Sequence, residues 1–178
     1  MNLPNLLTML RILMIPLFVY LLVYDFTVWA LGVFVVAGLT DALDGAVARM
    51  SGQQTELGKY LDPIADKLLI TTAFVALAML ALIPYWMLII VISRDVILLL
   101  GTVVMHVTQG GFDIAPSMLG KVTTAAQLLL IVMVLSALVG MNTEPYMDGA
   151  MWMVAAVTVT SGLHYLFRGV RRLNGDLV

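Results

Sequence analysis

Residues 41–66 read DALDGAVARMSGQQTELGKYLDPIAD and contain four aspartates in a sequence that is 62% hydrophobic. Asp41 and Asp44 are three residues apart, whereas Asp62 and Asp66 are four apart. On a helix, both spacings place two carboxylates on one face, with about 5–6 Å between Cβ atoms. The connection between the pairs, about residues 50–56, is short enough for two antiparallel helices. The stretch therefore predicts two neighbouring helix ends that carry four carboxylates toward one point.

The rest of the chain is too apolar for a protein dissolved in water. Of its 178 residues, 11% are charged, and the mean hydropathy is +1.04, whereas a soluble domain has roughly a quarter charged residues. One small globule cannot bury this much apolar surface, so lipid must be the solvent for most of it. Each membrane crossing needs about 20 residues. The apolar segments fall at about 7–24, 28–50, 60–82, 84–107, 117–140 and 147–169.

These segments predict the fold class. Continuous apolar runs without dyad alternation favour helices over a closed barrel. We therefore expect an all-α membrane protein with six transmembrane helices, formed by a single domain over residues 1–178. The chain begins with Asn5, Thr8 and Arg11 at three-residue spacing, which puts them on one helical face. This pattern predicts a short N-terminal amphipathic start, whose polar side chains either reach a bound ligand or anchor the helix at the interface.

The distribution of cationic residues predicts the orientation. The links near residues 25, 84 and 142–148 contain no Lys or Arg, whereas the opposite helix ends hold Arg11, Arg49, Lys59, Lys121, Arg168, Arg171 and Arg172. The positive-inside rule then puts both termini and the 41–66 motif on the cytoplasmic side. Because no basic, serine-rich leader is present, a bacterial cytoplasmic membrane is favoured. The net charge of −2 gives no reason to expect nucleic acid as a partner.

Four carboxylates close together near lipid repel one another and are costly to desolvate. Protonation, pairing with cations and metal binding are the three ways to stabilise them. The chain has no cysteine, and oxygen ligands alone select hard ions, so Mg²⁺ or Mn²⁺ is expected. Four carboxylates suit two ions about 3.5–4 Å apart, which is the arrangement that assists displacement at phosphorus. A small transporter or channel with an acidic cytoplasmic site is the alternative of another class, although transporter sites usually lie near the midplane.

The motif also resembles the signature of the CDP-alcohol phosphatidyltransferase family, D-x-x-D-G-x-x-A-R-x8-G-x3-D-x3-D. The chain matches all the fixed positions, which are Asp41, Asp44, Gly45, Ala48, Arg49, Gly58, Asp62 and Asp66. The resemblance implies that the four aspartates hold two divalent metal ions and that Asp66 is the catalytic base. It further implies that Gly45, Ala48, Arg49 and Gly58 shape the pocket for the CDP part of CDP-diacylglycerol. Asn5 and Thr8 are candidates to reach the same nucleotide from the first helix, with an interfacial anchor as the alternative. The family is also typically homodimeric.

The acceptor alcohol is the open question within this family. Residues 30–45, 82–96 and 116–128 resemble the cardiolipin synthases of the superfamily, which use phosphatidylglycerol. Relatives that use glycerol 3-phosphate show an Arg-Glu pair followed by a second Arg, whereas this chain has Arg94-Asp95 and no Arg or Lys from 97 to 106. A dianionic phosphate monoester needs several fixed cations, so phosphatidylglycerol is the favoured acceptor and glycerol 3-phosphate the alternative. The candidate contacts to the acceptor phosphate are Arg94, Lys121, His164 and Arg168.

Overall fold

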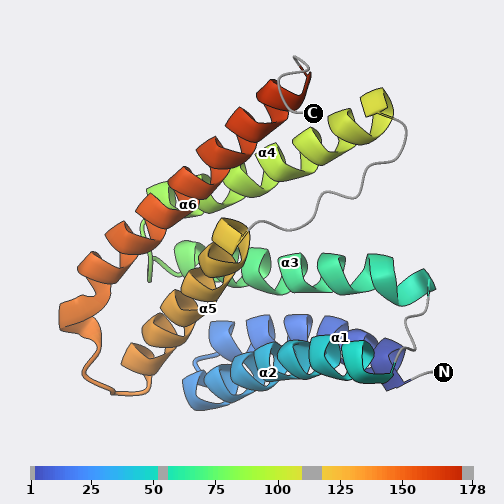
Figure 1. The fold of residues 1–178 in the computed structure, drawn as a ribbon. Coiled ribbons are helices and arrows are strands. Elements are labelled where there is room, and N and C mark those ends of the chain that lie inside the picture. Colours follow the sequence, from blue (N-terminus) through green and yellow to red (C-terminus); the bar gives the residue numbers. More distant parts are fainter. Residues whose placement is uncertain (1–2, 52–55, 110–117, 174–178) are drawn as a thin grey trace. The chain divides into compact units, whose positions relative to one another are not determined.

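The computed structural model describes the backbone of residues 3–51, 56–109 and 118–173, and the side chains of 8–40, 65, 67–104, 118–169 and 171. The described backbone forms six α-helices (Figure 1). They are α1 Leu3–Val23, α2 Thr27–Ser51, α3 Glu56–Met79, α4 Tyr85–Gln109, α5 Met118–Leu138 and α6 Glu144–Leu173. Each overlaps one of the six predicted apolar segments, and its ends lie within four residues of the predicted ones, so the predicted all-α class and the helix positions are confirmed. The helix α1 is continuous from Leu3, with no break between the expected amphipathic start and the apolar run.

The helices divide into two compact units. The first contains residues 1–83 and 131–145, and the second contains residues 84–130 and 146–178. In the first unit, α1 packs against both α2 and α3. Figure 1 shows the start of α1, the end of α2 and the start of α3 at one end of this unit. The described backbone of the motif, residues 41–51 and 56–66, therefore lies at the end of the first unit where α1 begins.

Apolar side chains are exposed on all six helices. Leu13, Trp29, Leu68, Ile89, Leu129 and Leu163 are examples, one from each helix in chain order. Soluble proteins rarely expose large contiguous apolar surface. Three described segments are long and apolar enough to cross a bilayer, namely Tyr85–Val104, Met118–Leu138 and Glu144–Gly169. Shorter apolar helical segments occur at Thr8–Val23, Thr27–Thr40 and Lys67–Met79. Lipid is therefore the solvent that suits the surface of the described helices.

Three of the helices end in the same hydrogen-bonded motif. Asp25, Ala81 and Gly140 follow α1, α3 and α5 with φ values of 62°, 57° and 89°. In each case the following amide donates to a carbonyl five residues back, at 2.8, 2.9 and 3.0 Å. The left-handed residue itself donates to the carbonyl three residues back. This is the Schellman motif, which satisfies the last carbonyls of a helix and favours glycine at the left-handed position.

Two of these left-handed positions lack glycine, which gives a test of the backbone geometry. Ala81→Gly should raise the free energy of unfolding by up to about 1 kcal/mol, because Cβ is disfavoured at positive φ. Gly140→Ala should lower it by about 1 kcal/mol, although a Cβ there meets nothing within 4 Å. Gly149→Ala is the matched control within α6, where a Cβ also meets nothing within 4 Å. It should stabilise the helix. Thermal unfolding in detergent would measure all three changes, and a stabilising Gly140→Ala would contradict the assignment.

Candidate functional site

The predicted metal and nucleotide residues lie on the two helices that flank the 52–55 connection. Asp41, Asp44, Gly45, Ala48 and Arg49 belong to α2, and Gly58, Asp62 and Asp66 belong to α3. The side chains of these residues, and that of Asn5, lie outside the described part of the structure. What the backbone establishes is that one aspartate pair is on the final turns of α2 and the other is in the first half of α3.

The described parts of these helices show which faces are buried. On α2, Ala30, Phe34 and Ala37 are buried at spacings of four and three residues. On α3, Leu69, Ala73 and Leu77 are buried at four-residue spacing, beside Ala65, Ile70, Phe74, Ala76 and Ala78. Such spacings define one stripe along a helix. Both helices therefore have one apolar face turned into the first unit.

The polar start of α1 is also turned inward. Thr8 is 1% exposed and Arg11 is 0% exposed, and they begin a buried stripe that continues through Ile15, Phe18 and Leu22. An interfacial anchor keeps its polar groups in contact with water, and these two side chains have no such contact. Of the two roles that the sequence left open for this face, the burial of Thr8 and Arg11 favours an inward one.

Metal ligation rests on residues whose side chains the structure does not describe. Among the described side chains, no group of three or more His, Asp or Glu residues is placed to hold a metal ion. The four aspartates of the motif are not part of that set. Their chemistry fits a hard divalent cation, since carboxylate oxygens are the ligands that Mg²⁺ and Mn²⁺ prefer.

In the second unit, Arg94 joins α4 to α6. Its Nη1 donates to Asp95 Oδ1 at 2.8 Å, and its Nη2 donates to Ser161 Oγ at 3.4 Å. Arg94 is 6% exposed, while the Asp95 side chain is 16% exposed. Gly162 lies beside this pair, because a Cβ there would be 3.6 Å from Arg94 Cγ. The positive charge of Arg94 is therefore compensated within the unit.

The polar face of α6 was not predicted from the sequence. Thr158, Ser161 and Tyr165 are separated by three and four residues, and each makes a contact to another helix. Gln127 Nε2 donates to Thr158 Oγ1 at 3.3 Å, and Thr102 Oγ1 and Tyr165 Oη are 2.9 Å apart. The helical spacing of these hydroxyls was a visible signal, but Ser and Thr are common in membrane helices and their partners lie far away in sequence.

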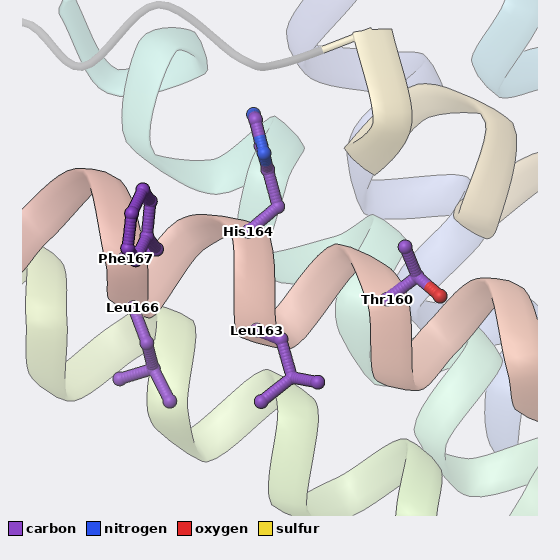
Figure 2. A pocket seen from close by; sticks show the side chains of 5 residues that line it. All are labelled: Thr160, Leu163, His164, Leu166 and Phe167. Carbon is purple, nitrogen blue, oxygen red and sulfur yellow. The ribbon is translucent and has the colours of Figure 1, made fainter.

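A pocket lies on the C-terminal half of α6. It has a volume of about 630 Å³ and is lined, among the described residues, by Thr160, Leu163, His164, Leu166 and Phe167. Figure 2 shows His164 and Phe167 on one side of α6, with Leu163 and Leu166 on the other. Two other predicted acceptor contacts, Lys121 and Arg168, are exposed. The structure thus places His164 in a largely apolar pocket, while Arg94 contacts α6 at Ser161.

The Arg94 contacts predict unequal costs for removing its partners. Asp95→Ala leaves a buried cation without its carboxylate, so it should lower the free energy of unfolding by about 3 kcal/mol. Ser161→Ala removes one long hydrogen bond and should cost about 1 kcal/mol or less. The two variants can be compared by thermal unfolding in the same detergent. Equal losses would mean that the Arg94–Asp95 pair contributes no more than the serine contact.

Comparison with known proteins bears on the same residues. The sequence profile of the family described as CDP-alcohol phosphatidyltransferase matches residues 1–160. A CDP-diacylglycerol–glycerol-3-phosphate 3-phosphatidyltransferase of Bacillus subtilis is 36% identical, over 92% of this chain and 93% of its own. A CMP-forming cardiolipin synthase of Homo sapiens is 34% identical, over 96% of this chain and 62% of its own. The profile match includes the whole 41–66 motif and both polar residues at the buried start of α1. The chain therefore belongs to the CDP-alcohol phosphatidyltransferase family.

Proposed function

We propose that this enzyme transfers the phosphatidyl group of CDP-diacylglycerol to phosphatidylglycerol, giving cardiolipin and CMP, with two divalent metal ions. The observation that carries the proposal is the complete family signature on α2 and α3, within a chain matched by the family over residues 1–160. Family membership also argues against the transporter alternative, because the family and the Bacillus subtilis relative are named as transferases and the human relative as a synthase.

The helical register supports a shared carboxylate site. The buried stripe of α2 at positions 30, 34 and 37 continues by helical periodicity to positions 41 and 44. The stripe of α3 at positions 77, 73 and 69 continues in the same way to 66 and 62. Each aspartate pair thus falls in line with the face by which its helix packs. We propose Asp41, Asp44, Asp62 and Asp66 as ligands of two Mg²⁺ or Mn²⁺ ions.

The residues of the motif then have separate roles in a single substitution reaction at phosphorus. Asp66 accepts the proton of the acceptor hydroxyl, whose oxygen forms a bond to the phosphorus that carries diacylglycerol, while the bond from that phosphorus to CMP breaks. Divalent ions, when bound, supply neutralisation of the pyrophosphate and of the leaving group. The CDP part is held by Gly45, Ala48, Arg49 and Gly58, with Asn5 and Thr8 contributing from α1.

The second unit supports a lipid acceptor. The charge of Arg94 is already compensated by Asp95 at 2.8 Å, and residues 97–106 of α4 supply no other cation. A phosphodiester carries one negative charge and needs fewer fixed cations than a phosphate monoester. The α6 pocket offers mostly apolar lining around His164, which suits an acceptor with acyl chains. Lys121 and Arg168 are the remaining proposed contacts to its phosphate.

Glycerol 3-phosphate is the second candidate acceptor. The Bacillus subtilis relative, whose name specifies that substrate, is similar over nearly its full length. Its 36% identity is close to the 34% of the human cardiolipin synthase, so overall similarity does not separate the two activities. The local charge around Arg94 is the basis for preferring phosphatidylglycerol.

We further propose that residues 1–178 form one homodimerising domain whose six helices all cross the bacterial cytoplasmic membrane. Three segments have the length and hydropathy of a crossing, and the shorter apolar segments belong to helices of 21 to 25 residues. Both termini and the 41–66 motif would face the cytoplasm, since the cations lie at those helix ends.

Replacement of the proposed base provides the first functional test. Asp66→Asn should retain binding of CDP-diacylglycerol but lose about 10²-fold or more in the rate of CMP release, because the amide cannot accept the proton. Binding of the nucleotide lipid and CMP release should be measured on the same purified preparation. Near-normal CMP release from this variant would remove the base assignment.

An acceptor-swap assay provides the second test. Purified protein with Mn²⁺ and CDP-diacylglycerol should form cardiolipin when phosphatidylglycerol is added, and should form little product with glycerol 3-phosphate. Omission of the metal is the control and should abolish CMP release in both reactions. Product from glycerol 3-phosphate alone would reverse the choice of acceptor while leaving the family chemistry intact.

A further inference from the structure

The mechanism above gives no role to Arg11, the most completely buried cation among the described residues. Arg11 lies on α1 and is 0% exposed, between Thr8 and Ile15 on the buried stripe of that helix. A guanidinium cannot lose its proton in a protein, and burying it is costly unless an opposite charge lies nearby. The position of Arg11 therefore calls for an anionic neighbour inside the first unit.

The packing of α1 on α2 identifies that neighbour by register. The rings of Phe18 on α1 and Phe34 on α2 are 5.5 Å apart between centroids, which fixes the level at which the two helices meet. The helices are consecutive and joined by a short turn, so they run antiparallel (Figure 1). Moving seven residues from this contact toward the start of α1 reaches Arg11, and moving seven residues toward the end of α2 reaches Asp41. Both steps rise about 10.5 Å along the helix axes.

Positions 11 and 41 lie on the same helix faces as Phe18 and Phe34, as well as at matching heights along the helix axes. Seven residues make nearly two full turns of an α-helix, with a drift of about 20°. Because Phe18 and Phe34 face each other, positions 11 and 41 also lie on the facing sides of α1 and α2. Moving ten residues from the ring contact, instead of seven, reaches position 8 on α1 and position 44 on α2, which therefore lie at the same level along the helices. Register therefore brings the buried polar residues of α1 to the level of the first aspartate pair.

We infer that Arg11 is a positioning residue that compensates the charge of Asp41 and Asp44 and holds this aspartate pair in place before the metal ions arrive. The inference rests on the proposed metal site. Four carboxylates at one site repel one another in the metal-free enzyme, and a fixed guanidinium on the neighbouring helix offsets part of that repulsion. Arg11 thus acts through the aspartates and does not contact the substrate.

A direct contact between Arg11 and the nucleotide is the competing explanation. Burial alone does not separate the two explanations, because Thr8, a proposed nucleotide contact on the same face, is 1% exposed and Arg11 is 0% exposed. The two explanations predict different effects of substitution, because a nucleotide contact changes binding of CDP-diacylglycerol and a positioning residue changes the metal-free state.

The test compares thermal unfolding of the full-length protein in EDTA and in saturating Mn²⁺. Arg11→Met should lower Tm by on the order of 10 °C in EDTA, and Mn²⁺ should restore at least about half of that loss, because the ions replace the missing positive charge. Arg11→Lys, which keeps the charge, should lose less in EDTA. Ile15→Ala is the control on the same stripe, and its loss of Tm should be equal with and without Mn²⁺. KM for CDP-diacylglycerol should stay within about twofold of wild type in Arg11→Met.

Two results would overturn the inference. If Arg11→Met lost the same Tm in EDTA and in Mn²⁺, as the Ile15 control does, Arg11 would only fill space. If its metal response matched wild type and its KM for CDP-diacylglycerol rose tenfold, Arg11 would be a nucleotide contact. Should Arg11→Met not survive purification without metal, it can be prepared in Mn²⁺ and then treated with EDTA. A wild-type protein that showed no response to Mn²⁺ would instead contradict the proposed metal site.

Discussion

Compensation of buried charge is the constraint on which the arrangement of this protein depends. All six described helices expose large apolar side chains, so every ionised group buried between them needs a partner from another helix or from its own neighbours. Arg94 shows the solution directly, with Asp95 and Ser161 around one guanidinium. Arg11 is the buried cation of the first unit, and we propose the same kind of compensation for it. Buried polar residues in such a bundle therefore indicate where two helices must pack in a fixed register.

The two units divide the proposed chemistry between them. The first unit contains the family signature on α2 and α3 and the buried start of α1, which together would handle the nucleotide lipid. The second unit contains all four candidate contacts to the acceptor phosphate, namely Arg94, Lys121, His164 and Arg168. Under this proposed division, changes in acceptor use are expected to concentrate in α4, in the first half of α5 and in α6. The charge-neutral Arg94–Asp95 pair is one such place.

Much of the fold could be predicted from the sequence because its signals are local. Six long apolar runs predict six helices, and two Asp pairs at three- and four-residue spacing predict two adjoining helix ends. The sequence also placed Thr8 and Arg11 on one face, but it could not decide whether that face meets water or protein. The partners of Thr158, Ser161 and Tyr165 were missed for the same reason. A hydrogen bond between residues 31 to 67 positions apart depends on helix packing, which no local pattern encodes.

The Schellman motifs after α1, α3 and α5 bear on how the chain is assembled. Each closes its helix end with backbone groups less than seven residues apart, so no later part of the chain is needed to satisfy those carbonyls. In a bilayer, the last carbonyls of a helix would otherwise need hydrogen bonds from water or from a lipid headgroup. Each of these turns can therefore be completed during synthesis, as soon as its own residues have left the ribosome.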